Sequence, residues 1–332
     1  MAITICGSCV EFGSFTMCDT SPGFSFPGVI KAQCGFCDTR EPAGQGSTSG
    51  YSSLGYSPSP AAFQVNVDKF SFASDGNATD VGELTQGRYN AGGMSSSVSL
   101  YTAGGIPPPT NNVIDKMPFV SEGTGTDVGD LTGGGREGPA GHMSDVSGYV
   151  SGGEGFNAIE KFPFASDGNT TDVGEMIVSG GRGAGITSID FGYRAGGSLP
   201  DRTQIEKFPF STDSNSSDVG ELATGVGNNA AGQNSKTNGY VAGGLLLPST
   251  RVSCIQKFPF ASDSPGSVIG GLTVNRRGLS GSSSCVSGYS AGGQQNPAIC
   301  NTIDKFPFAT DASATDVGDL PCGKYGLSGH QV

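Results

Sequence analysis

Residues 148–222 contain almost the same phrase twice. The first copy reads GYVSGG at 148–153 and IEKFPFASDGNTTDVGEM at 159–176, and the second reads GYRAGG at 192–197 and IEKFPFSTDSNSSDVGEL at 205–222. The lysine of this phrase recurs six times, at separations of 45 to 50 residues: Lys69, Lys116, Lys161, Lys207, Lys257 and Lys305. A self-similar period of this length is typical of repeat architectures such as propellers and solenoids.

Each repeat contains four short extended segments separated by turn residues, and no segment has the period of an amphipathic helix. The segments are a Gly/Ser-rich run, a tyrosine phrase that ends in Gly-Gly, the Lys-Phe-Pro-Phe run and an Asp-Val-Gly run. A four-stranded antiparallel sheet of this size cannot bury both of its faces alone, whereas several sheets arranged radially can stack face on face. The sequence therefore predicts an all-β fold, a six-bladed β-propeller.

The two ends of the repeat region predict how the ring closes. The first repeat begins with its tyrosine phrase at Tyr51 and has no Gly/Ser run before it, while the chain ends at Val332 after a Gly/Ser run that has no tyrosine phrase. We expect the C-terminal run to supply the innermost strand of the first blade. This assigns residues 50–332 to the propeller and residues 1–49 to a small cysteine-rich attachment module.

Composition excludes several classes of partner. The chain has 332 residues, a net charge of −12 and 14% charged residues, so neither nucleic acid nor an anionic membrane surface is an expected partner. No apolar run approaches the length of a membrane span, so no membrane insertion is expected. The start, MAITICGSCVEFGSF, lacks the basic region of a secretory signal. We therefore expect the protein either to stay inside the cell or to leave as part of a larger particle.

The N-terminal module holds two CxxC pairs about 25 residues apart, Cys6 with Cys9 and Cys34 with Cys37. Two such pairs supply four thiolates to a tetrahedral ion, and the sequence therefore predicts a zinc site. The alternatives are reduced, buried thiols or disulfides formed after release from the cell. Cys18 is then a spare thiol or an alternative ligand. A module this small needs a metal, a crosslink or docking onto another protein to be held in one structure.

Two repeated features have both a structural and a functional interpretation. The polar turn before the Asp-Val-Gly run carries oxygens at alternate positions, as at Asp75, Asn77 and Asp80, which suits Ca²⁺ but also suits Asx-turns. The structural interpretation is favoured. In the Lys-Phe-Pro-Phe strand, alternation predicts that Phe162 and Phe164 pack between blades and that Lys161 is solvated.

The inventory for catalysis is small. The two histidines, His142 and His330, are expected on innermost strands where they could face the central channel, and neither stands in a motif with a nucleophile. A copper or zinc site in the channel is the catalytic alternative, but we expect a protein that is not an enzyme. The cysteines of the last two repeats either pair outside the cell or pack as small buried hydrophobes: Cys254, Cys285, Cys300 and Cys322.

The order of the four segments resembles the kelch repeat over about five sixths of the chain. The resemblance includes an arginine after the fourth segment, at Arg88, Arg136, Arg182 and Arg276. Kelch blades usually carry a tryptophan near the valine of the Asp-Val-Gly run, and this chain has no tryptophan. The wording GYxAGG, KFPFxSD and TDVGxL resembles repeat proteins encoded by marine bacteriophages, especially those of cyanobacteria. That resemblance implies a structural component of a virion or fibre.

The expected function is therefore that of a multi-copy virion protein, in a tail, fibre or capsid surface, assembled in the host cytoplasm and released with the particle. Its propeller would present loops to a host-surface glycan, a receptor or another virion protein, because recognition usually lies in loops on a rigid scaffold. The loops that differ most between repeats are the candidates: Ile106, Pro107, Pro108 and Pro109 in one, and Leu245, Leu246 and Leu247 in another. The alternative is an intracellular kelch-type scaffold that binds one protein partner.

Overall fold

The computed structural model describes residues 3–6, 9–12, 15–18, 44–107, 111–198, 203–226, 229–246 and 248–332. The chain divides into two compact units, Met1–Glu41 and Pro42–Val332. In the first unit three strands form an antiparallel sheet: β1 (Ile3–Cys6), β2 (Cys9–Phe12) and β3 (Phe15–Cys18). Their register places Cys6 opposite Cys9, and Cys9 opposite Cys18.

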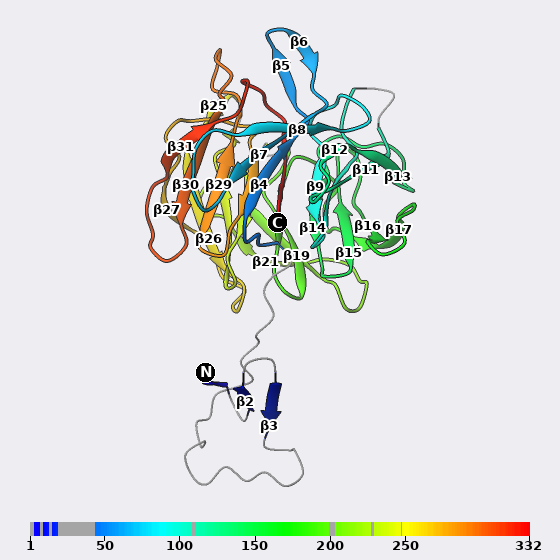
Figure 1. Cartoon of the computed structure of the whole chain (residues 1–332), viewed down its shortest axis with the longest axis vertical. Helices are drawn as coiled ribbons and strands as arrows, with labels where there is room; N and C mark the ends of the chain where they lie inside the picture. The colour runs from blue at the N-terminus through cyan, green and yellow to red at the C-terminus, as the bar shows by residue number, and fades with distance from the viewer. Residues whose placement is uncertain are drawn as a thin grey trace. The chain divides into compact units, whose positions relative to one another are not determined.

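The second unit is a ring of four-stranded antiparallel sheets, so the predicted six-bladed β-propeller is confirmed (Figure 1). From the innermost strand outward, blade 1 consists of β32 (Ser328–Gln331), β4 (Ser49–Ser53), β7 (Asn66–Ser71) and β8 (Thr79–Glu83). Blade 2 consists of β9 (Gly92–Ser95), β10 (Ser99–Ala103), β11 (Val113–Pro118) and β13 (Thr126–Asp130). Blade 3 consists of β14 (Ala140–Met143), β15 (Ser147–Ser151), β16 (Ala158–Pro163) and β17 (Thr171–Glu175).

Blades 4 to 6 repeat this order. Blade 4 consists of β18 (Ala184–Thr187), β19 (Phe191–Ala195), β20 (Gln204–Pro209) and β21 (Ser217–Glu221). Blade 5 consists of β22 (Ala231–Asn234), β23 (Asn238–Ala242), β26 (Cys254–Pro259) and β27 (Ser267–Gly271). Blade 6 consists of β28 (Ser280–Ser283), β29 (Ser287–Ala291), β30 (Thr302–Pro307) and β31 (Thr315–Asp319). The short strand β12 (Gly123–Thr124) of blade 2 pairs in parallel with β8 of blade 1.

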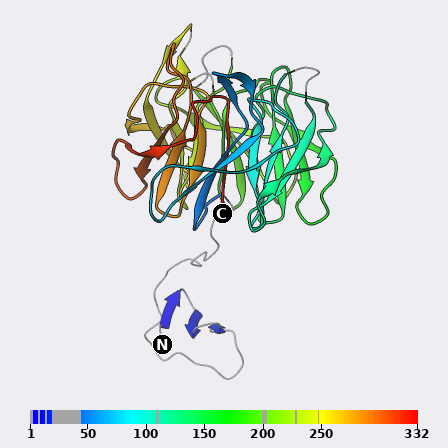
Figure 2. The ribbon, with the colours of Figure 1, turned by 45° about the horizontal axis from the view of Figure 1, so that its top comes forward.

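The first blade is completed by the C-terminus. Strand β32 pairs antiparallel with β4, with His330 opposite Tyr51. The Val332 carbonyl then accepts hydrogen bonds from the backbone N–H groups of residues 47–49 at 2.7 to 3.0 Å. Because the last strand of the chain lies beside the first strand of the ring, the propeller has no open seam (Figure 2).

Strand alternation gives the ring two different faces. Connections from the second to the third strand, and from the fourth strand to the next blade, lie at one end, which we call the loop face. Turns between the first and second strands, and between the third and fourth, lie at the other end, the turn face. The segment 44–48 belongs to the turn face, where Gly46 N–H donates to the Ser283 carbonyl at 2.8 Å.

Glycine lines the central channel because the innermost strands approach one another closely. The second residue of each innermost strand is glycine: Gly93, Gly141, Gly185, Gly232, Gly281 and Gly329. A Cβ at Gly232 would lie 2.1 Å from the carbonyl oxygen of Gly185, and a Cβ at Gly329 would lie 2.0 Å from that of Gly281. No side chain fits these positions, which explains the Gly/Ser-rich composition of the innermost strands.

A second glycine rule operates inside each blade. The glycine before the blade tyrosine lies under the first phenylalanine of the next strand, and a Cβ at Gly148 would lie 2.5 Å from Phe162 Cζ. Blade 2 differs from the others. Leu100 stands in place of the glycine, and Met117 stands in place of the phenylalanine opposite it. The flexible methionine accommodates a leucine where the rigid ring would not fit.

The remaining phrase residues join neighbouring blades. The blade tyrosines are buried, and each packs against the second phenylalanine of the following blade with ring centroids 4.7 to 5.0 Å apart. The six phrase lysines each bond a carboxylate of the following blade: Lys69–Glu122, Lys116–Asp167, Lys161–Asp213, Lys207–Asp263, Lys257–Asp311 and Lys305–Asp75. The expected inter-blade packing of Phe162 and Phe164 is found, but Lys161 is ion-paired rather than simply solvated.

Buried ion pairs link four of the six blades to the connections that lead into them. Arg88 pairs with Asp115, Arg136 with Glu160, Arg276 with Asp304, and Lys324 with Asp68. Blade 4 keeps the acid, Glu206, but takes its cation from Arg194 within the blade at 3.2 Å. Blade 5 has the neutral Gln256, whose amide bonds the backbone N–H and carbonyl of Thr224. A buried charge is therefore paired wherever it occurs in these six positions.

Arg182 follows a fourth strand as expected, but it does not belong to this set of buried ion pairs. Counting back from the channel glycine, Arg88, Arg136 and Arg276 each stand five residues before it, whereas Arg182 stands three before Gly185. The offset moves Arg182 to the mouth of the channel on the loop face, where it is half-buried.

Candidate binding face

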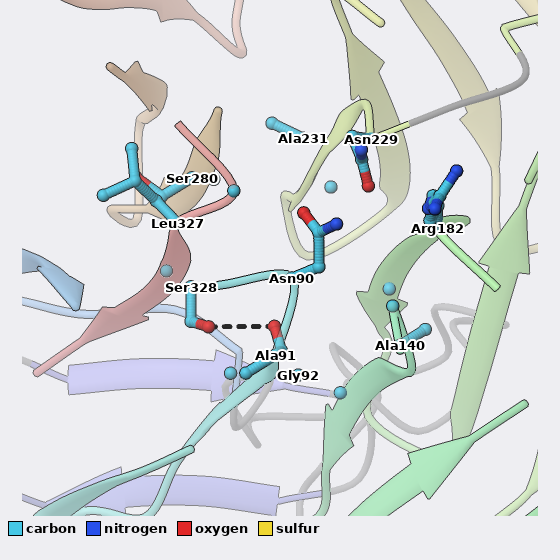
Figure 3. A pocket seen from close by; sticks show the side chains of 18 of the residues that line it. Asn90, Ala91, Gly92, Ala140, Arg182, Asn229, Ala231, Ser280, Leu327 and Ser328 are labelled. Carbon is cyan, nitrogen blue, oxygen red and sulfur yellow. Dashed lines mark hydrogen bonds between the residues drawn. The ribbon is translucent and has the colours of Figure 1, made fainter. Parts of the chain in front are cut away.

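A shallow cavity of about 110 Å³ lies where the central channel opens on the loop face (Figure 3). Its rim is the residue two positions before each innermost strand: Asn90, Gly138, Arg182, Asn229, Gly278 and Gly326. All six have positive φ, between 54° and 71°, and three of them carry side chains at the mouth. Figure 3 shows Asn90, Asn229 and Arg182 around the opening.

The rim is held by a closed circle of backbone hydrogen bonds. Each rim N–H donates to the carbonyl of the rim residue in the preceding blade, at 2.6 to 2.9 Å, from Asn90 around to Gly326 and back. Because both groups of each rim residue are used in the circle, the mouth cannot widen in one blade without breaking bonds to two neighbours. The loop face is therefore built on a rigid base.

The charge of Arg182 at the mouth is neutralised locally. Its Nη2 donates to Glu137 Oε1 at 2.5 Å, and Asn90 Nδ2 donates to the same oxygen at 3.2 Å. Glu154 lies 3.6 Å from Arg182 Nε. Arg182 is therefore a structural part of the rim, and its charge already has carboxylate partners.

An aromatic cluster stands beside the mouth. The hairpin of β5 (Tyr56–Pro58) and β6 (Ala61–Phe63) projects from blade 1 (Figure 1). Tyr56 lies 5.5 Å from Phe63 and 5.7 Å from Tyr325 between ring centroids, and Phe63 stacks on Tyr89 at 5.8 Å. Phe63 remains 41% exposed, so the cluster presents an aromatic surface to solvent.

A second hairpin, β24 (Leu245–Leu246) with β25 (Thr250–Arg251), projects from blade 5 on the same face. It carries Arg251 beside Arg277, which lies in the connection from blade 5 to blade 6. Arg251 Nη2 and Arg277 Nε both donate to Gln294 Oε1 at 3.1 Å. Partial burial, and then the nearby charge of Arg251, lower the pKa of Arg277.

The predicted binding loops are both on the loop face, but their side chains are disposed differently from the expectation. Ile106 and Pro107 are half-buried, and the Ile106 backbone pairs with Tyr89. Leu245 is buried and Leu246 half-buried, so the start of this run packs inward rather than standing in solvent. Pro108, Pro109 and Leu247 lie outside the described residues.

The expectation that the histidines face the channel is wrong. Both are fully buried between blades, because the glycine that precedes each one takes the channel side of the strand. His142 Nε2 bonds Ser151 Oγ at 2.8 Å and its Nδ1 bonds the Ile186 carbonyl, while His330 bonds Ser53 and the Met94 carbonyl. Burial lowers the pKa of each histidine to about 4, so both are neutral near pH 7.

The polar turns are occupied by contacts within the protein, two of them between blades. Asp75 bonds Lys305, Asn77 Oδ1 accepts from Asp319 N–H at 3.0 Å, and Asp80 Oδ1 accepts from Gly82 N–H at 3.2 Å. These three oxygen donors thus serve three different partners. Within the described ranges, no group of three or more His, Cys, Asp or Glu side chains is arranged to hold a metal.

The predicted zinc ligands belong to the first unit. Cys6 and Cys9 end β1 and begin β2, and Cys18 ends β3 in register with Cys9. Cys34 and Cys37 lie outside the described residues. In the propeller the four cysteines are free thiols: Cys254, Cys285, Cys300 and Cys322.

Sequence reasoning missed the aromatic cluster and the paired arginines. The signal for the cluster was present in YSPSPAAF at 56–63, an insertion with two aromatic residues between strands that other blades join differently. Arg251 and Arg277 are 26 residues apart in the chain, and no pattern in the repeat predicts that they lie close together.

The described ranges contain no helix that is long and apolar enough to span a membrane. Comparison with known proteins assigns the chain to no family: no protein-family model matches it, and no curated protein matches it significantly.

Proposed function

We propose that this protein is a non-enzymatic binding protein of a virion, whose propeller presents its loop face to a host-surface or virion partner. The proposal rests on the contrast between the interfaces between blades, which are repeated, and the loop face, which differs from blade to blade. The interface residues recur in nearly every blade, whereas the hairpins β5–β6 and β24–β25 each occur once among the described residues and project from the same end of the ring. Differences confined to loops on a rigid base are typical of recognition.

Three further features support binding over catalysis. The histidines are committed to bonds within and between blades, glycine occupies the second position of each innermost strand along the channel, and the cavity of about 110 Å³ at its mouth is too small for most substrates. The aromatic surface at Phe63 and the cationic pair at Arg251 and Arg277 are the two chemically distinctive places on the loop face.

The virion setting rests on the resemblance of the repeated motifs GYxAGG, KFPFxSD and TDVGxL to repeat proteins of marine bacteriophages. The cysteine-rich first unit would then attach the ring to a particle, with zinc at Cys6, Cys9, Cys34 and Cys37 or with Cys18 as a ligand. The segment 44–48 joins the ring at the turn face, at the end opposite to the loop face.

The test is to isolate particles from the native source, image them by electron cryomicroscopy and assay zinc in the same preparation. The proposal expects a projecting six-bladed ring in multiple copies, with its loop face pointing outward or against another subunit, and about one zinc per chain. Recovery of the chain only as a free protein in cell extract would contradict the virion setting and favour the intracellular scaffold.

A further inference from the structure

Arg251 and Arg277 differ from twelve other cations of the described propeller. The six phrase lysines, the five buried cations and Arg182 all have a carboxylate partner within 3.6 Å. Among the described residues, neither Arg251 nor Arg277 has a carboxylate within ion-pair distance. In a chain with a net charge of −12, where acids outnumber bases, two adjacent arginines without an acid are an exception that needs a physical reason.

The geometry holds the two guanidinium groups close together. Because each donates to the same Gln294 oxygen at 3.1 Å, the two donor nitrogens lie at most about 6 Å apart. The amide oxygen is neutral and cannot offset two positive charges. Arg251 Nε is buried and has no hydrogen-bond acceptor, so a donor is left unsatisfied beside the pair. Two forks of this kind match a carboxylate, which accepts hydrogen bonds on both oxygens.

The aromatic cluster begins next to this pair. Gly278, the residue after Arg277, lies against Tyr325 so closely that a Cβ there would be 3.3 Å from Tyr325 Cβ. From Tyr325 the aromatic contacts continue through Tyr56 to the exposed Phe63. A ligand that extends from Arg277 toward Phe63 would therefore contact positively charged groups at one end and aromatic rings along the rest of its length.

The other polar groups favour a hydroxyl-rich ligand over a protein. The nearby mouth carries the amides of Asn90 and Asn229 and a wall of small residues. The large apolar side chains that the described part of the loop face exposes are Phe63 and Ile177, which come from blades 1 and 3 and form no continuous patch. Protein interfaces have a more apolar core than this. Aromatic faces with a few polar groups are typical of small-ligand and saccharide sites.

We propose that Arg251 and Arg277 bind the carboxylate of an acidic saccharide whose sugar rings lie along the aromatic cluster of Tyr325, Tyr56 and Phe63. This inference rests on the proposed role of the loop face as the binding surface, and it names the chemical class of the ligand. The carboxylate would displace Gln294 as the main partner of the two arginines.

The test is calorimetric titration of the full chain with tetragalacturonate, a tetrasaccharide that carries a carboxylate on each ring, and with neutral maltotetraose. We expect the acidic ligand alone to bind. Arg251→Gln and Arg277→Gln should each weaken its binding about tenfold or more, since each removes a charge-assisted hydrogen bond. Phe63→Ala should weaken it a few-fold by removing the exposed ring, with the arginines intact.

Lys236→Gln is the matched control, because it removes one positive charge from an exposed turn on the turn face. It should leave binding unchanged. If Arg277→Gln fails to fold, as judged by its melting temperature, Arg277→Lys keeps the charge but loses the fork and should still weaken binding.

Four results would overturn the inference: no binding of tetragalacturonate, equal binding of maltotetraose, equal binding by the arginine variants, or competition by inorganic sulfate alone at the same concentration. Tighter binding of poly-glutamate than of the saccharide would assign the site to an acidic protein instead. Each of these results leaves the particle imaging unaffected, so failure of the saccharide site and failure of the virion proposal are distinguishable.

Discussion

The interfaces between blades and the loop face are built by opposite rules. At the interfaces the same solution is repeated around the ring: a tyrosine on a phenylalanine, a lysine on a carboxylate, and a glycine against a backbone. On the loop face the blades share the rim of the mouth, but the hairpins, the aromatic cluster and the arginine pair each occur once among the described residues. The comparison teaches that in this chain repeated residues build the structure, whereas elements that occur in one blade and project from the loop face are the candidates for function.

The largest effect should separate two arginines, one from each region. Arg136→Met leaves Glu160 buried without its partner and should lower the free energy of unfolding by about 3–5 kcal/mol. Arg182→Met removes a half-exposed pair with Glu137 at the mouth and should cost about 1 kcal/mol or less. Urea denaturation of the two variants measures the difference. Equal costs would show that the interface is no more demanding than the face.

The buried histidines give the interfaces a dependence on pH. Their pKa of about 4 in the folded protein lies below the value of about 6.5 expected in the unfolded chain, so protonation favours unfolding. Their stabilising effect is complete above pH 6.5 and is lost as the pH falls from 6.5 toward 4, by about 3 kcal/mol for each histidine. The difference in melting temperature between wild type and His330→Asn should shrink across this range. A constant difference would contradict the neutral, buried state.

Two glycine substitutions separate the cost of steric crowding from the cost of an unfavourable backbone conformation. Gly232→Ala places a methyl group against the Gly185 carbonyl and should destabilise by about 3 kcal/mol, at the upper end for overpacking. Gly155→Ala, at a loop position with φ of 80° and open space around it, should cost only about 1 kcal/mol from its left-handed backbone. Melting temperatures of the full chain report both changes. A tolerated Gly232→Ala would mean that the innermost strands are further apart than described.

The smallest effect on stability should come from the loop face itself. Phe63→Ala removes a 41% exposed ring and should change the free energy of unfolding by about 0.5 kcal/mol. Thermal denaturation checks this expectation, with Phe162→Ala as the interface control that should cost about 3–5 kcal/mol. Similar losses of unfolding free energy at the two positions would contradict the distinction between the blade interfaces and the loop face.

The fold was predictable because its determinants are local phrases repeated at one period. The blade count follows from six lysines, and the inward packing of Phe162 follows from strand alternation. The sites were not predictable for the same reason. His142 was expected in the channel because the sequence shows which strand it occupies but not that its glycine neighbour takes the channel side. Arg182 was grouped with the other arginines because it too follows a fourth strand, but it stands three residues before its channel glycine, whereas the others stand five before theirs.

Some departures from the repeat can be explained only from the structure, which shows the partner of each changed residue. Leu100 with Met117 reads as an imperfect repeat until the two residues are found opposite each other. Gln256 in blade 5 likewise reads as a conservative change until its bonds to Thr224 are seen in place of an ion pair. The meeting of Arg251 with Arg277 depends on how two connections fold over one another, which no periodicity encodes.

The most direct test of the account compares the two faces in one binding measurement. The loop-face variant Phe63→Ala/Arg251→Gln/Arg277→Gln and the turn-face variant Val98→Ser/Val146→Ser/Val286→Ser each change three residues, and the three valines are 60%, 69% and 68% exposed. Retention of each folded protein on host-envelope material from the native source is then compared with that of wild type. The account predicts that the loop-face variant loses retention and the turn-face variant keeps it. Loss in the turn-face variant alone would contradict the assignment of recognition to the loop face.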